Sequence, residues 1–215
     1  MSHDNQLQQD VLAELGWEPS VTAAHIGVTA RAGVVTLTGY VESFAQKHAA
    51  ETAVCHVKGV KAVAEEIEVR LPFHINKGDE EIAVAAVDCL EWDVSVPVDT
   101  VKVEVDKGWI TLSGEVDWNY EKEAAELDVR RLLGLVGVTN RIAINSRVKT
   151  RSLSHDIKNA LHRTWLDPQT IEVSAQGGNI RLTGTVNSLH DRQTAEATAW
   201  AAPGATSVEN DIAVI

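Results

Sequence analysis

The chain is poor in the residues that characterise disulfide scaffolds and membrane-spanning proteins. Its two cysteines, Cys55 and Cys89, occupy different places in the internal repeat described below, which favours reduced thiols over a disulfide framework. No apolar run approaches the ~20 residues that a membrane-spanning helix needs. The first ten residues hold neither a basic nor an apolar segment, so we expect a cytoplasmic protein, or a periplasmic one if the native start differs.

Basic residues are also scarce, since 19 Lys and Arg stand against 31 Asp and Glu and give a net charge of −12. This balance argues against nucleic acid as a partner, because phosphate contacts need clustered cations. One basic cluster is present, formed by Arg141, Arg147, Lys149 and Arg151. It could contact anionic phospholipid headgroups at about 1 kcal/mol per residue. The behaviour of most charge runs favours a solvated linker that balances acidic neighbours.

The motifs of common enzymes and metal sites are missing. No Ser-His-Asp set, phosphate-binding glycine loop or metal motif stands out, so we expect no enzyme, no cofactor and no metal. The histidines never align between repeats. His48, Cys55 and His56 would share one side of a helix, but three donors without a fourth make a poor zinc site.

What the chain does contain is an internal repeat of about 70 residues. Three segments beginning at Thr36, Thr111 and Arg181 align without a gap. The aligned positions include Leu37, Leu112 and Leu182; Gly39, Gly114 and Gly184; Gly59, Gly134 and Gly204; and Ile67, Ile142 and Ile212. We therefore predict three domains, over residues 1–72, 76–147 and 151–215.

The hydrophobic pattern of each repeat predicts the order α-β-β-α-β. A helix with Leu7, Val11 and Leu15 on one face precedes two period-2 strands joined by a tight turn at Gly33. A second helix then carries an apolar stripe, and a right-handed crossover places the last strand parallel to the second. The predicted fold class is an α/β, or α+β, sandwich in which two helices cover one face of a three-stranded mixed sheet and leave the other face open.

Several repeated residues have a structural interpretation. We expect Gly39, Gly114 and Gly184 to be required by the backbone, through a positive φ angle or a close approach of strand and helix, rather than to admit a ligand. We expect Gly59, Gly134 and Gly204 to end the second helix at its C′ position. Trp17, Trp92 and Trp165 are expected to anchor the cores. Glu51, Glu126 and Glu196 each follow a basic residue by four positions, which predicts an i,i+4 ion pair.

Large apolar residues in the loop between the second strand and the second helix are the candidate binding residues. Phe44, Trp118, Tyr120 and Leu189 occupy this region, where a side chain should be wet unless it makes a contact. They either insert into a lipid or protein interface or cover a neighbouring repeat, and the sequence leaves both open. Trp109 is expected on the open sheet face. The third copy has alanines along its second helix and therefore a thin core, so we expect its stability to depend on contact with a neighbouring repeat.

The motif Leu-[Ser/Thr]-Gly-x-Val, followed twenty residues after its glycine by a second glycine and then by a V-x-x-x-I strand, resembles the BON domain. The resemblance covers nearly the whole chain and implies an α/β sandwich without catalytic activity, linked to envelope stress, phospholipid binding or protein interaction. The sequence thus predicts a monomeric or weakly oligomeric stress-associated binding or scaffolding protein that contacts phospholipid headgroups or a protein. The alternative is a cytosolic sensor of a monovalent cation such as potassium.

Overall fold

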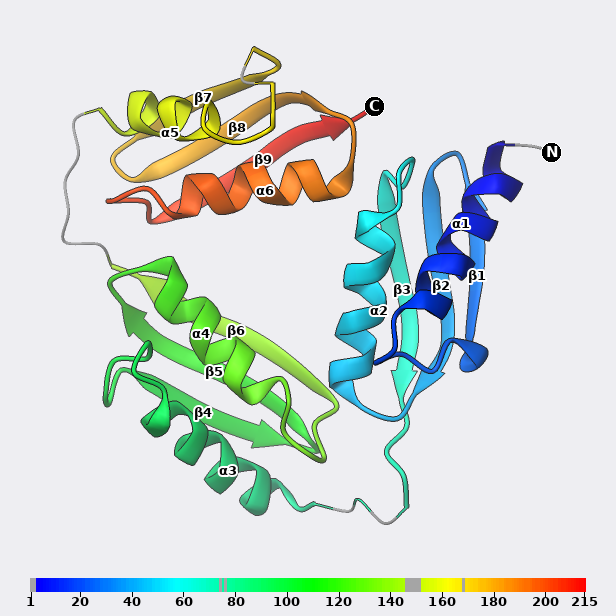
Figure 1. Ribbon diagram of the computed structural model, residues 1–215. Helices are drawn as coiled ribbons and strands as arrows, with labels where there is room; N and C mark the ends of the chain where they lie inside the picture. Colours follow the sequence, from blue (N-terminus) through cyan, green and yellow to red (C-terminus); the bar gives the residue numbers. More distant parts are fainter. Residues whose placement is uncertain (1–2, 74, 76, 146–151, 168) are drawn as a thin grey trace.

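A computed structural model describes residues 3–73, 75, 77–145, 152–167 and 169–215. It contains three units of the same element order, which confirms the predicted fold class (Figure 1). Unit 1 comprises α1 (His3–Trp17), a 3-10 turn (Ala23–His25), β1 (Ile26–Arg31), β2 (Val34–Val41), α2 (Phe44–His56) and β3 (Ala62–Val69). Unit 2 comprises α3 (Asp79–Trp92), β4 (Val101–Asp106), β5 (Trp109–Val116), α4 (Asn119–Val129) and β6 (Gly137–Ile144). Unit 3 comprises α5 (Leu153–Leu161), β7 (Ile171–Gln176), β8 (Asn179–Val186), α6 (Leu189–Trp200) and β9 (Ser207–Val214).

Each sheet has its second strand in the middle. In unit 1, β2 pairs antiparallel with β1 and parallel with β3, and units 2 and 3 repeat this topology. The antiparallel pair closes through a turn in which both central residues, Ala32 and Gly33, have positive φ angles of 52° and 83°. Two consecutive positive φ angles are the signature of a type I′ turn, whose twist matches that of the strands. The predicted tight hairpin is therefore present.

Each unit has its own hydrophobic core between its helices and one face of its sheet. The first-helix face predicted for unit 1 is confirmed, since Leu7, Val11 and Leu15 are all buried. The prediction for Gly59 is wrong in detail, because α2 already ends at His56 and the glycine lies beyond the helix with a φ of 92°. It serves the turn into β3, a position that favours a residue without a Cβ.

The three repeated tryptophans are not core residues, which corrects the expectation from the sequence. Trp17, Trp92 and Trp165 are 84%, 89% and 70% exposed. Trp17 and Trp92 are the last residues of α1 and α3, while α5 ends at Leu161 and leaves Trp165 outside the helix. In α1 and α3 the last buried residue, Leu15 or Leu90, precedes the tryptophan by two positions, which turns the tryptophan to the opposite side of the helix.

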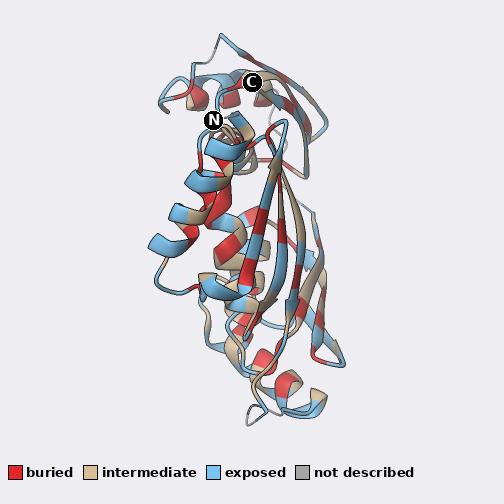
Figure 2. Ribbon diagram, turned by 90° about the vertical axis from the view of Figure 1, so that its right-hand side faces the viewer, coloured by how far each residue is buried: buried red, intermediate tan, exposed pale blue. Residues whose placement is uncertain are grey.

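The units are joined in a ring by their second helices. Figure 1 shows α2, α4 and α6 toward the middle of the molecule and α1, α3 and α5 at the periphery. Phe44, at the start of α2, packs against the core of unit 2, and Leu189, at the start of α6, packs against the core of unit 1. Figure 2 shows the helices of unit 1 on one side and its sheet on the other. The start of each second helix thus meets the end of the next, a pseudo-threefold arrangement.

Candidate functional site

The candidate binding residues do not all lie in the predicted loop, since Phe44 and Leu189 are the first residues of α2 and α6 and Tyr120 lies in α4. Two of the candidates have a partner within the chain. Phe44 and Leu189 are partly buried at the junctions between units. The sequence left open whether they insert into an external interface or cover a neighbouring repeat, and in the structure they cover a neighbouring repeat. The junction between units 1 and 3 also contains His56 and His190, whose rings lie edge to face with centroids 4.9 Å apart. His190 stacks in turn on Trp165, at a centroid distance of 5.8 Å.

Trp118 and Tyr120 lie at the junction between units 2 and 3. With Ala197 and Trp200 of α6 and Ala201, the residue after that helix, they line a cleft of about 530 Å³. The backbone amides of Asp117 and Trp118 both donate to the Glu121 carboxylate, at 2.9 and 3.0 Å, which fixes the start of α4. Trp118 is half-buried and Tyr120 remains 57% exposed.

Trp109 lies on the open face of the unit 2 sheet, in line with the strand alternation. Its indole Nε1 donates to the Thr139 hydroxyl at 2.9 Å, and its ring covers Gly137, where a Cβ would come within 2.4 Å of the ring. The ring is therefore held flat on the neighbouring strand rather than projecting from the sheet. Arg147, Lys149 and Arg151 lie outside the described residues.

The most exposed apolar residues of unit 2 lie at the end of α3 and in the loop that follows it, a region for which the sequence predicted only a core anchor at Trp92. Trp92, Val94 and Val98 are 89%, 100% and 76% exposed, and we call them the Trp92 loop surface. All three are large apolar residues that fall between the end of the predicted first helix and the predicted first strand. Apolar residues in such a connection are a signal from which an exposed contact surface could have been predicted. Glu91, Asp93 and Asp99 border this surface, so its rim is acidic.

The loop is held in a fixed shape. Val96 is buried in the unit 2 core, and the Asp93 carboxylate accepts from the Ser95 amide at 2.7 Å. Unit 1 builds the same loop with Glu18, Ser20 and the buried Val21. Where unit 2 has Val94 and Val98, unit 1 has Pro19 and Ala23. The fold therefore does not require the two exposed valines, and a preordered loop loses little entropy on binding.

Among the described residues, none of the repeated glutamates forms an ion pair with the basic residue four positions before it, although Glu126 pairs with Arg130, four positions after it, at 2.7 Å. Instead, Glu126 and Glu196 accept hydrogen bonds at 3.1 and 3.0 Å from the amides of Asn140 and Asn210, on the last strands. In unit 1 this asparagine is replaced by Glu65. Burial raises the pKa of Glu65, and Lys47, 3.6 Å away, partly offsets that effect. Glu126 and Glu196 thus tie helix to sheet and serve the fold.

One carboxyl group of unit 2 titrates far from its ordinary range. Burial first, and then the neighbouring carboxylate of Asp93, raise the pKa of Asp128 to about 6. A folded-state pKa above the unfolded value of about 3.9 means that the folded protein binds this proton more tightly. The contribution of Asp128 to stability is therefore greatest below about pH 4, falls as the pH rises to about 6, and stays lost above it.

We expect the substitution Asp128→Asn to raise the free energy of unfolding at pH 7 by about 1 kcal/mol, after allowance for solvent screening of a partly exposed group. The amide keeps the shape of the neutral acid and carries no charge. Urea unfolding at intervals from pH 4 to pH 7 measures the effect, and the decline over that range should flatten. An unchanged profile in the variant would contradict the assignment.

Within the described part of the chain, no group of three or more His, Cys, Asp or Glu side chains is placed to hold a metal ion. None of the described helices is both long enough and apolar enough to cross a bilayer.

Comparison with known proteins gives a consistent family match. The BON domain family matches residues 3–70, 78–146 and 150–215. Osmotically-inducible protein Y of Escherichia coli (strain K12) is 31% identical over 141 residues, which cover 64% of this chain and 70% of the relative. These matches give no support to the cytoplasmic location expected from the first residues.

Two solved structures of CdsD, a structural protein of the type III secretion system of Chlamydia trachomatis, also align with the chain. The first is 16% identical with a TM-score of 0.27, and covers 98% of this chain and 92% of CdsD. The second, of the C-terminal domain, is 15% identical with a TM-score of 0.26, and covers 100% and 99%. At these TM-scores the superpositions carry no argument.

Proposed function

The chain belongs to the BON domain family, and from that premise we propose that it is a non-enzymatic, stress-associated scaffold that binds another protein through the Trp92 loop surface. The observation that carries the proposal is the exposure of Trp92 at the end of α3 and of Val94 and Val98 on the loop of fixed shape that follows. Exposed apolar clusters of this kind mark contact sites. The link to stress rests on the family and on the name of the Escherichia coli relative, which is osmotically inducible.

The acidic rim supports a protein rather than an anionic membrane as the partner. Glu91, Asp93 and Asp99 would face the phosphates of an anionic leaflet, where like charges repel. The same carboxylates complement a protein segment that carries apolar side chains flanked by lysine or arginine. We therefore assign the surface to a basic, apolar protein segment.

The test compares two variants of the full chain in affinity capture from osmotically stressed cells that make the protein. One variant carries Trp92→Ala, Val94→Ala and Val98→Ala, and the control carries Trp17→Ala, at the equivalent exposed position of unit 1. We expect the wild-type chain and the control to retain a protein with a basic, apolar segment, and the triple variant to lose it at least tenfold, because aromatic anchors dominate interfaces. Equal capture by all three chains would overturn the assignment.

Two further measurements separate the other functions considered. If the surface binds phospholipid, the wild-type chain will float with phosphatidylglycerol vesicles and the triple variant will not. If the protein is a monovalent-cation sensor, its melting temperature will rise with potassium chloride but not with equal sodium chloride. We expect neither result.

A further inference from the structure

The cleft between units 2 and 3 lies where the other two junctions of the ring are filled by an apolar side chain. At those junctions the first residue of a second helix, Phe44 or Leu189, packs against the core of the neighbouring unit. The equivalent residue of α4 is Asn119, and within the described part of the chain no apolar side chain of unit 2 packs against the core of unit 3. Asn119 instead donates from its amide to the Glu123 carboxylate at 2.7 Å. The opening of about 530 Å³, which we call the Trp118 cleft, is within the ~300–1,000 Å³ typical of small-molecule sites.

Three aromatic side chains line the Trp118 cleft. Trp118 and Tyr120 come from the start of α4, and Trp200 is the last residue of α6. Among the described residues, none of these three rings stacks on another ring or on a cationic side chain. Their faces are therefore not occupied by another ring or by a charge of the chain itself.

The charges around the cleft favour a cation. Glu123 is the only charged residue on its lining among the described residues. Trp200 ends α6, so the negative end of that helix dipole lies at the cleft. The positive end of α4 lies on the other wall, but Glu121 opposes it by accepting from the amides of Asp117 and Trp118 at 2.9 and 3.0 Å.

The pseudo-threefold repeat provides an internal control for these residues. The equivalents of Trp118 are Ser43 and Ser188, and each of these serines caps its helix by accepting from a backbone amide. Trp118 makes no such bond in α4, so a serine would serve the helix better. Glu123 corresponds to Gln193 in unit 3. Neither the tryptophan nor the carboxylate is therefore required by the fold.

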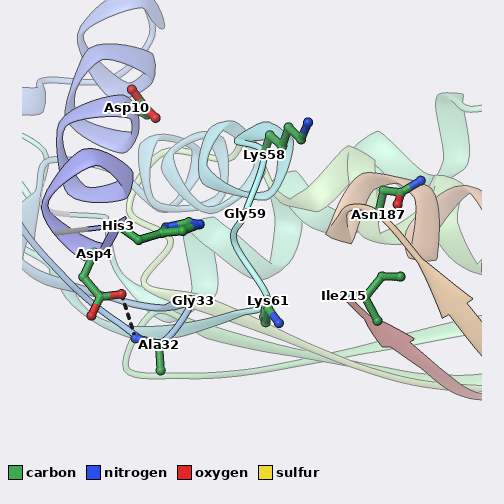
Figure 3. Close-up of a pocket in the computed structure, with 10 residues that line it drawn as sticks. All are labelled: His3, Asp4, Asp10, Ala32, Gly33, Lys58, Gly59, Lys61, Asn187 and Ile215. Carbon is green, nitrogen blue, oxygen red and sulfur yellow. Dashed lines mark hydrogen bonds between the residues drawn. The ribbon is translucent and has the colours of Figure 1, made fainter. Parts of the chain in front are cut away.

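The cavity of about 640 Å³ between units 1 and 3 lacks this combination. Figure 3 shows Asp4 and Asp10 around it as well as Lys58 and Lys61, which is two carboxylates against two ammonium groups. No tryptophan, tyrosine or phenylalanine is among the described residues that line it. Of the two cavities, only the Trp118 cleft combines aromatic faces with charge of one sign.

We propose that the Trp118 cleft binds an organic cation with a methylated ammonium group, which lies against the rings of Trp118, Tyr120 and Trp200 and near the Glu123 carboxylate. Aromatic faces attract cations, and tryptophan does so most strongly. A quaternary ammonium has no N–H to leave unpaired, whereas an alkali-metal ion needs a shell of oxygen ligands that aromatic walls do not provide. A free small molecule and the choline headgroup of a lipid share this chemistry. The site has no residue in common with the Trp92 loop surface.

The experiment titrates choline chloride into the full chain at constant ionic strength and follows the tryptophan indole N–H signals by NMR. We expect saturable shifts for Trp118 and Trp200 and none for Trp17. The neutral analogue of choline, in which carbon replaces the ammonium nitrogen, should bind roughly tenfold more weakly, because it keeps the shape and lacks the charge. Equal affinity for the two compounds would rule out a cation site.

Two substitutions test the cleft, and each installs the residue of another unit. Trp118→Ser and Glu123→Gln should each weaken choline binding by roughly fivefold or more. Trp17→Ser and Glu104→Gln make the same chemical changes at exposed positions of units 1 and 2, and both should bind choline as the wild-type chain does. Unchanged binding in both cleft variants, or an equal loss in the controls, would overturn the site. The melting temperature without ligand checks that each variant is folded.

Flotation with phosphatidylcholine vesicles identifies the source of the ammonium group. If the wild-type chain floats and Trp118→Ser does not, the ligand is a lipid headgroup. If the wild-type chain binds choline but does not float, the ligand is a free small molecule.

Discussion

The substitution Gly114→Ala will unfold unit 2, because the new methyl group has no room. Gly114 has a φ of 135°, and a Cβ there would lie 2.0 Å from the backbone oxygen of Thr100. Both the disfavoured backbone and the collision with main-chain atoms must be relieved by separating β4 from β5. We expect a loss of stability on the order of 3 kcal/mol or more. Gly39 and Gly184 have the same geometry against His25 and Thr170.

The matched control is Gly16→Ala, on α1. Nothing lies within 4 Å of a Cβ at Gly16, so alanine should leave unit 1 intact or stabilise it by about 0.5–1 kcal/mol through its higher helix propensity. Urea unfolding followed by tryptophan fluorescence and by hydrogen exchange in the three sheets measures both effects. If Gly114→Ala retained normal protection in β4 and β5, a ligand-admitting role for this glycine would be the better explanation.

The repeat made the fold predictable. An apolar residue that recurs at the same position in all three copies is a core residue rather than a chance occurrence. Leu37 and Ile67 are such residues, and both are buried as expected. The alternation in the strands and the hairpin glycine follow from local geometry, which a short window of sequence records. Element order, pairing and sheet topology therefore required no information beyond the unit itself.

The surfaces were less predictable, because they depend on how the units meet. Phe44 and Leu189 are indistinguishable by sequence from membrane-inserting residues, and only the ring places each against the core of another unit. The tryptophans illustrate the opposite error. Trp165 falls four residues after Leu161, a helical spacing, but α5 has already ended. A pattern cannot show where a helix stops when no strong end signal is present.

The same dependence between units predicts that residues 151–215 expressed alone will be less stable than unit 3 is in the full chain, by about 2 kcal/mol or more. The α6 face that covers its sheet consists of small side chains, Ala195 and Ala199, followed by Ala202 and Ala205 in the turn. Unit 1 has Val54, Val57 and Val60 at the last three of these positions. Each missing pair of methyl groups removes buried apolar area.

The contacts across the junction compensate for this thin core. Leu189 packs on unit 1 and His190 meets His56, so excision removes the partners of both side chains. The substitution Leu189→Asp in the full chain should reproduce part of the loss, since it places a charge against an apolar core. Hydrogen exchange in β7, β8 and β9 of both proteins is the measurement. Equal protection in the excised unit and the full chain would mean that unit 3 folds independently, and the ring would then be a consequence of three stable domains rather than a condition for the third.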